Sequence, residues 1–345
     1  MPSGPERQKC AKLQPGIKPF EITAFPSSLP LHGGRLILRD PVRHFHSSVQ
    51  HGGVAATEQR MLSPYLVEHR YMAVKRCKHG LFMYNRNDAF VGRGLDLYGE
   101  WCDFEIQLIR QFLRPGDIVI DAGANIGTHT IAFANYVGPT GVVHAFEPQR
   151  QNFLMLSGNV AINALTNVFC HQKAVGDRNG EIKIPGMPPA DTNFNYSAVS
   201  IAGGSETGEA VPLVTLDSLN LPSCRVIKID TEGMEPQVLG GSKDLIARCR
   251  PLLYVENNEP GASQRLYPLL EKLGYSAWWS IFTYYDARNF YSNTVNVWEN
   301  VVPSCNMLCV PKEANLVLPG HEPFLGPEDD WKNCVARMNA RAKQG

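Results

Sequence analysis

The stretch from Asp117 to Gly127, with the sequence DIVIDAGANIG, constrains the fold of this chain more than any other feature. Its apolar residues 118–120 predict a buried β-strand that ends at the acidic Asp121. A glycine-rich turn follows, and helical periodicity begins directly after it. A buried strand, such a turn and a helix, in this order, are typical of the first unit of a Rossmann-like α/β sheet, where a nucleotide-like ligand lies at the carboxyl end of the strand.

Strand-like and helix-like segments then alternate along the chain. We count five β-α repeats, followed by two strands with no helix between them, which favour an antiparallel pair at one edge of the sheet. This alternation predicts an α/β fold with a doubly wound, mostly parallel sheet that is covered by helices on both faces. The expected strands of this sheet span residues 118–120, 142–146, 167–172, 226–230, 252–255, 275–281 and 306–310.

Other segments are expected outside the main sheet or between its strands. A short strand is predicted at residues 81–84, two alternating strands at 181–185 and 211–216, and one helix over 236–249. The polar, glycine-rich residues 191–208 lie between the two alternating strands and predict a long loop. A loop of that size in a compact domain commonly has a function.

The composition along the chain predicts three parts. Residues 1–65 are rich in proline and have little periodicity, so we expect an irregular or disordered extension; their basic excess leaves an organelle-targeting peptide open. The main folded domain is expected over residues 66–311, and residues 312–345 are expected to form a C-terminal tail. Because the sequence has no long apolar run and no secretory signal, we expect a cytoplasmic protein without stable membrane insertion.

Charge and cysteine content argue against two classes of site. The formal net charge is +0, so no overall electrostatic field attracts nucleic acid, and we expect no nucleic-acid partner. The nine cysteines are odd in number, scattered, and without a C-x-x-C pair. We therefore expect reduced thiols and no zinc site.

Several residues near the first strand are candidates for binding a cofactor. Gly123 and Gly127 allow a tight turn and a close approach of the backbone to a ligand. Asp121, at the end of the strand, is expected to accept hydrogen bonds from the turn or from a ligand amine. Asn125 lies within the turn and is placed to cap the helix.

Acidic residues also follow the next two strands. Glu147 lies at the tip of the second strand, where a carboxylate can accept both ribose hydroxyls, and Asp177 after the third strand is placed to accept the adenine amine. The turn is one glycine short of the dinucleotide pattern G-x-G-x-x-G, and the rim is acidic. These features favour S-adenosylmethionine, which has no phosphate, over NAD.

The set of motifs resembles the FkbM family of class I S-adenosylmethionine-dependent methyltransferases over about residues 80–310. The resemblance implies a seven-stranded sheet with the last strand antiparallel, a methyltransferase domain at residues 66–311, and O-methylation of sugars or polyketide-like natural products. Thr231 departs from the family, which usually has an apolar residue there. The motifs are Tyr98–Trp101, Asp121–Gly127, Phe146–Pro148, Ala174–Asp177, Val214–Asp217 and Ile227–Gly233. Glu100, in the first of these motifs, is a further candidate cofactor contact.

The chemistry of methyl transfer to a hydroxyl requires in-line alignment and removal of a proton. Asp230 and Glu232, at the tip of the fourth strand, are the candidate catalytic residues. The alternative that Asp230 only caps the following turn and that Glu232 pairs with Lys228 or with an arginine stays open. A divalent cation held by these two carboxylates is also left open, although it is not predicted. Its further ligands would be Glu256, Asn257 or Asn258.

The acceptor site is expected to use three side chains outside the cofactor motifs. Tyr196 in the long loop, Trp279 in the aromatic-rich late segment, and Asn257 are the candidates. His129, one turn into the first helix, is a weaker candidate for a base. The expected partner is a small-molecule acceptor. A lipid or protein acceptor, a nicotinamide-dependent oxidoreductase, and a binding module without turnover remain alternatives.

Overall fold

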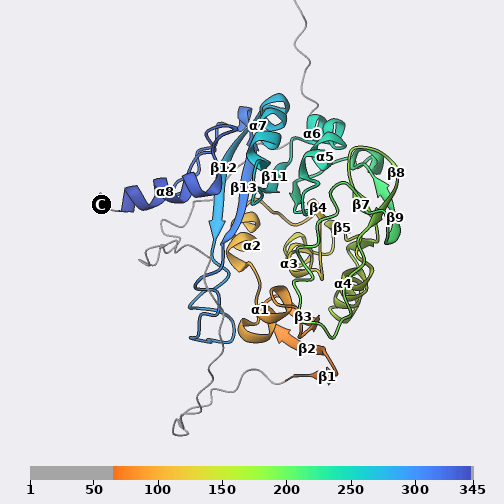
Figure 1. The fold of residues 1–345 in the computed structure, drawn as a ribbon. Helices are drawn as coiled ribbons and strands as arrows, with labels where there is room; N and C mark the ends of the chain where they lie inside the picture. Colours follow the sequence, from red (N-terminus) through yellow and green to blue (C-terminus); the bar gives the residue numbers. More distant parts are fainter. Residues whose placement is uncertain (1–64, 343–345) are drawn as a thin grey trace, which may run out of the picture.

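The computed structural model describes residues 65–342 of this chain, and a seven-stranded sheet forms its centre (Figure 1). The sheet has the strand order β12-β13-β11-β10-β4-β5-β6. The expectations for residues 1–64 lie outside the described residues. The strands of the sheet are β4 (Ile118–Ala122), β5 (Val142–Phe146), β6 (Val168–His171), β10 (Val226–Ile229), β11 (Leu252–Glu256), β12 (Tyr275–Phe282) and β13 (Ser304–Pro311).

The direction of the strands confirms the predicted fold class. The neighbouring pairs formed by β6, β5, β4, β10 and β11 are all parallel, whereas β13 runs antiparallel to both β11 and β12. The last strand is therefore inserted between β11 and β12, and β12 forms the edge of the sheet. In register, Ala122 pairs with both Phe146 and Ile229, so the carboxyl ends of β4, β5 and β10 lie level at one rim.

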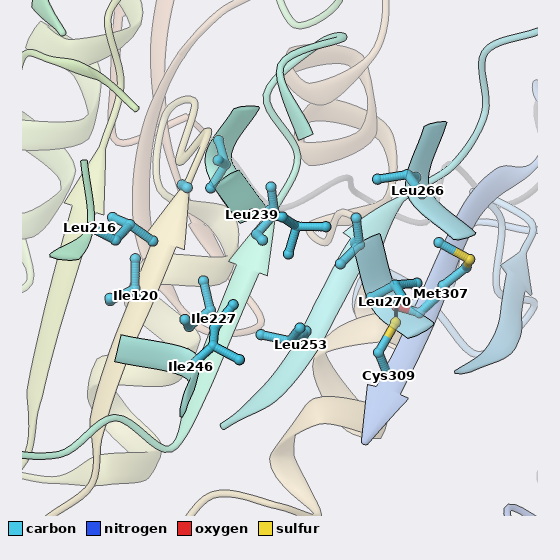
Figure 2. Packing of buried hydrophobic residues seen from close by; sticks show 14 of the residues in the cluster. Ile120, Leu216, Ile227, Leu239, Ile246, Leu253, Leu266, Leu270, Met307 and Cys309 are labelled. Atoms are coloured by element: carbon cyan, nitrogen blue, oxygen red, sulfur yellow. Dashed lines mark hydrogen bonds between the residues drawn. The ribbon is translucent and has the colours of Figure 1, made fainter. Parts of the chain in front are cut away.

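Apolar side chains on the two faces of the sheet are covered by different helices. Val119 packs with α2 (Asp103–Arg110) and α3 (Thr128–Val137), whereas the next residue, Ile120, faces the opposite layer. Figure 2 shows that opposite layer, where Ile120, Ile227 and Leu253 of the strands meet Leu239, Ile246, Leu266 and Leu270 of the helices. Those helices are α5 (Glu235–Gly240), α6 (Lys243–Cys249) and α7 (Ala262–Leu273).

The helix predicted over residues 236–249 is thus two helices, α5 and α6, broken between Gly240 and Lys243. A Cβ atom at Gly241 would lie 2.0 Å from the carbonyl oxygen of Gly176. The chain following β7 (Ala174–Val175) crosses here, so the break lets two backbone segments approach closely. Only the tertiary contact reveals this, because the apolar periodicity continues through the break.

Two small sheets flank the main one. β7, β9 (Glu209–Val214) and β8 (Gly180–Ile184) form one, and the last two match the predicted alternating strands. The other contains β1 (Val67–His69), β2 (Met72–Cys77) and β3 (Gly80–Asn85), of which only β3 is predicted.

Side chains of α4 (Arg150–Ile162) fix this amino-terminal sheet to the domain. Asn159 Oδ1 accepts the amide proton of Met83, and its Nδ2 donates to the Met83 carbonyl at 3.0 Å. The sheet is followed by α1 (Val91–Tyr98), which leads to one wall of the site described below.

The segment expected to be a tail differs from that expectation. After the short helical turn η2 (Lys312–Ala314), the chain crosses back to β12 and ends in α8 (Trp331–Ala342). Cys334 of α8 is fully buried in the same core as β12, because Trp331 and Met338 complete an apolar face along this helix. None of the helices within residues 65–342 is both long and apolar enough to cross a membrane.

Candidate functional site

A cavity of about 430 Å³ opens at the rim where β4, β5, β10 and β11 end. Its walls come from the turn after β4, the start of α4, the loop before β9, and the segments before α2 and β13. The structure brings six of the predicted site residues to this cavity. They are Gly123, Asn125, Glu147, Tyr196, Asp230 and Glu232.

The two predicted glycines are required by contacts within the protein. Gly123 has φ +83°, and a Cβ atom there would lie 1.6 Å from the carbonyl oxygen of Asp230. Gly127 has φ +93° and lies outside the cavity, with Leu156 of α4 2.8 Å from the position of its missing Cβ. Close packing of the β4 turn, rather than a bound ligand, therefore excludes a side chain at both positions.

Asn125 and Glu147 join the first and second strands at the cavity. The Asn125 amide donates to Glu147 Oε2 at 3.0 Å, and the Gln149 amide donates to Oε1 at 2.7 Å. Asn125 has φ +50°, a left-handed conformation that directs its amide toward the carboxylate. Glu147 is 5% exposed, and burial raises its pKa to about 7. Each oxygen keeps a lone pair for a further donor.

Asp121 lies beneath the cavity and does not line it. It is fully buried, its Oδ2 accepts a hydrogen bond from Thr130 Oγ1 at 2.6 Å, and its Oδ1 lies 3.5 Å from Lys228 Nζ. Lys228 also lies 3.0 Å from Asp230 Oδ2. The expected direct contact of Asp121 with a ligand is therefore not supported, because its carboxylate is used to hold Thr130 and Lys228.

Three carboxylates gather on the other side of the cavity. Asp230, Glu232 and Glu256 each have an oxygen within 4.8 Å of the others, a spacing that a divalent cation would fit. Burial, together with the charge of Asp230, raises the pKa of Glu232 to about 9, and the same two effects raise that of Glu256. Burial alone would raise the pKa of Asp230, but the charge of Lys228 outweighs it and the pKa is lowered.

The loop before β9 forms the roof of the cavity. The Tyr196 carbonyl accepts a hydrogen bond from Asn152 Nδ2 at 3.1 Å, and Ser200 Oγ donates to the Glu232 carbonyl at 2.8 Å. A carbonyl can only accept, so the amide of Asn152 must turn its oxygen the other way. That Oδ1 atom is buried in the wall of the cavity without a partner in the described residues. The Tyr196 hydroxyl is bonded to its own loop, at Pro189.

An aromatic wall faces the carboxylates. Phe90, Trp101 and Tyr284 line the cavity, and the rings of Trp101 and Tyr284 stack 4.8 Å apart at an angle of 12°. Burial raises the pKa of the Tyr284 hydroxyl well above its usual value, so it stays neutral. Flat apolar rings opposite acidic oxygens suit a ligand with an apolar face and hydroxyl edges.

Two predicted cofactor contacts lie elsewhere. Glu100 is buried, and its Oε2 accepts hydrogen bonds from Lys78 Nζ at 3.1 Å and from the Phe290 amide at 3.0 Å. Asp177 is half-exposed and pairs with the adjacent Arg178 at 3.3 Å. The reason is that β7 leaves the main sheet to pair with β9, which carries Asp177 away from the rim.

Two predicted acceptor contacts are also outside the cavity. Trp279 packs in the core, where its Nε1 donates to Asp329 Oδ2 at 2.9 Å. Asn257 is buried, and its Nδ2 donates to Ser263 Oγ at 3.0 Å. Both side chains face α7 and the segment before α8, so these two predictions are corrected.

Sequence reasoning missed several residues of the cavity wall. Glu105 and Asn152 lie on helices and follow no recognisable motif. The sequence suggests Lys228 as a partner of Glu232, whereas its ion pairs within residues 65–342 are with Asp230 and Asp121. Asp121 and Lys228 pair in register on adjacent strands, which places opposite charges side by side. Once the two strands are aligned, this pair indicates that Asp121 is a partner of Lys228.

Comparison with known proteins finds a match to a family model over part of the chain. Residues 121–277 match the methyltransferase FkbM domain. The chain is 29% identical over 195 residues to 31-O-demethyl-FK506 methyltransferase FkbM of Streptomyces tacrolimicus. The aligned stretch covers 48% of this chain and 74% of that protein. It is also 29% identical over 146 residues to hexuronic acid methyltransferase AglP of Haloferax volcanii, covering 42% of this chain and 57% of that protein.

Solved structures have more distant similarity. The structure of methyltransferase FkbM from Methylobacillus flagellatus aligns at 16% identity with a TM-score of 0.37, covering 57% of this chain and 44% of that one.

Proposed function

This chain carries a methyltransferase FkbM domain over residues 121–277, and from that premise we propose that it transfers a methyl group from S-adenosylmethionine to a hydroxyl oxygen of a small acceptor. The acceptor is sugar-like or a related natural product. Two similar proteins, named for FK506 and for a hexuronic acid, support acceptors of this kind. The transfer is an in-line displacement at the methyl carbon, which the sulfonium activates when the cofactor is bound.

The observation that carries the proposal is the arrangement of Glu147 at the rim. Two backbone amides hold its carboxylate at 2.7 Å and 3.0 Å, so its orientation is fixed before a ligand arrives. The remaining lone pairs fit the two hydroxyls of a ribose, which donate as a pair. A buried carboxylate without a cation as direct partner is costly unless such donors satisfy it.

The adenine end of the cofactor is assigned to the roof side of the cavity. Ala174 and Val175 provide apolar surface there, and Asn152 Oδ1 is the acceptor that would receive the exocyclic amine in place of Asp177. The methyl acceptor is assigned to the space between the aromatic wall and the carboxylates Asp230 and Glu232. In this assignment the carboxylates receive hydrogen bonds from acceptor hydroxyls.

Binding of a dinucleotide such as NAD, in place of S-adenosylmethionine, is the main alternative to this proposal. A pyrophosphate would need a glycine at position 125 of the β4 turn. This chain has Asn125 there, in a left-handed conformation that brings its amide to Glu147. Isothermal calorimetry distinguishes the two ligands: S-adenosylhomocysteine should bind and NAD should not. Binding of NAD alone would contradict the proposal.

The activity is tested by transfer of a labelled methyl group from S-adenosylmethionine to pools of glycans, metabolites, lipids and proteins, with and without magnesium. We expect label in a hydroxyl-bearing small molecule. Glu147→Gln serves as the impaired control, and Asp177→Ala, outside the cavity, as the matched active control. Label confined to lipid or protein would overturn the acceptor class while keeping the enzyme class.

A further inference from the structure

His129 is a buried histidine in the wall of the cavity with a carboxylate beside its ring. It is the second residue of α3, is 6% exposed, and lines the cavity close to the turn after β4. Its Nε2 atom is buried and faces the carboxylate of Glu105. The ring packs at a tilt on Phe133, which fixes its plane.

Glu105 of α2 stands behind this histidine. Its Oε2 lies 3.4 Å from His129 Nε2. Its Oε1 accepts hydrogen bonds from Ser304 Oγ and, at 3.1 Å, from Asn306 Nδ2 of β13. Glu105 is 2% exposed and bonded at Oε1, so its carboxylate is held in one position beside the imidazole.

The other titratable groups that face the cavity are less suited to accept a proton. Asp230 is paired with Lys228, and burial beside Asp230 raises the pKa of Glu232 to about 9 and also raises that of Glu256. The Cys102 thiol also faces this space, and burial raises its pKa well above the usual value. An imidazole with one nitrogen facing a carboxylate is oriented to accept a proton at its other nitrogen.

We propose that His129 is the general base that takes the proton from the acceptor hydroxyl, and that Glu105 is the residue that positions and stabilises it. This inference rests on the proposed function and replaces Asp230 and Glu232 as candidate bases. In the step, the acceptor oxygen forms a bond to the methyl carbon while the bond from that carbon to sulfur breaks. The electron pair of the broken bond stays on sulfur, which leaves S-adenosylhomocysteine, and the hydroxyl proton passes to Nδ1 of His129, the ring nitrogen that does not face Glu105.

The test compares wild type, His129→Gln, His129→Asn and Glu105→Gln, with the acceptor identified in the labelled-methyl screen. Both histidine variants should lower kcat by about 100-fold or more, because a general base contributes about 10²- to 10⁴-fold. Glu105→Gln should lower kcat by about tenfold. The Kd for S-adenosylhomocysteine should stay within about threefold of wild type in all of them. His321→Gln, outside the cavity, is the matched control with unchanged kcat.

A structural role for His129 predicts different results. In wild type, kcat should fall toward acid pH, and this fall should disappear in His129→Gln. Substituted imidazoles should restore kcat to His129→Gly in order of their basicity, which mere filling of the space would not produce. A His129→Gln enzyme within threefold of wild-type kcat, or a parallel loss of S-adenosylhomocysteine binding, would overturn the inference.

Failure of the proposed function gives a separate result. If wild type neither binds S-adenosylhomocysteine nor labels any pool, the function itself is wrong, and the assignment of the base falls with it. If wild type labels an acceptor and the histidine variants do so equally well, only the assignment of the base is wrong.

Discussion

Lys228 Nζ lies 3.0 Å from Asp230 Oδ2, so the cation at the end of β10 neutralises the carboxylate nearest to it in the chain. Lys228 is 2% exposed and also lies 3.5 Å from the fully buried Asp121. A single buried ammonium therefore serves two carboxylates, one beneath the cavity and one in its wall. This shared cation explains why Asp230 is a poor base, although it lies where the sequence places one.

Replacing Lys228 with methionine should destabilise the domain. The substitution leaves the fully buried Asp121 without a cation, and breaking a buried pair in this way costs about 3–5 kcal/mol. Urea unfolding measures the loss. Lys312→Met, which removes an exposed pair with Glu271, is the control and should cost less than about 1 kcal/mol. Equal effects of the two variants would contradict the buried role of Lys228.

Glu147→Gln should weaken binding of S-adenosylhomocysteine by about 10- to 100-fold, because hydrogen bonds to a charged group contribute about 1.5–3 kcal/mol. The pKa of Glu147 is raised to about 7 by burial, and the ionised form is the better acceptor. Wild-type affinity should therefore fall as the pH drops from 8 to 6, whereas that of Glu147→Gln should change less. Calorimetry at both pH values checks this, and equal pH dependence would remove Glu147 from the site.

Glu232 should make the stability of the domain depend on pH. Burial and the charge of Asp230 raise its folded-state pKa from 4.5 to about 9, so the folded state retains a proton that the unfolded state releases. The favourable contribution of Glu232 to the free energy of unfolding is fully present below pH 4.5 and is lost as the pH rises toward 9. Glu232→Gln should therefore gain stability relative to wild type between pH 5 and 9, as measured by urea unfolding. A constant difference would show that Glu232 titrates normally.

Asn152→Ala should weaken S-adenosylhomocysteine binding by about three- to tenfold, the size of one neutral hydrogen bond. S-inosylhomocysteine has a carbonyl in place of the adenine amine, so its affinity should change little in this variant. Asp177→Ala should bind both ligands as wild type does, because Asp177 lies outside the cavity. Loss of binding in Asp177→Ala would restore the role that the sequence suggested for it.

The order of strands and turns was readable from the sequence because it depends on local patterns. The apolar run before Asp121, the acid after β5 and the late strands without a helix between them each appear within a short window. The level register of β4, β5 and β10 then brings Gly123, Glu147 and Asp230 together, as expected for parallel strands. These residues follow their strands directly, so no longer-range information was needed.

Residues further from the strand ends were harder to place. Glu100, Asp177, Trp279 and Asn257 have suitable chemistry, yet each has protein partners or lies away from the cavity. In each case another segment decides the outcome: the small sheet carries Asp177 away, and the segment before α8 supplies the partner of Trp279. Neither segment was expected to contact these residues.

By itself the sequence determined the alternating architecture and the strand ends at which ligand-binding residues stand, because hydrophobic periodicity and glycine-rich turns act over a few residues. The tertiary structure alone decided which polar side chains remain available to a ligand. Lys228 is occupied by two carboxylates, whereas Asn152 keeps an unsatisfied oxygen in the wall of the cavity. Availability depends on partners from distant segments, and folding sets those partners.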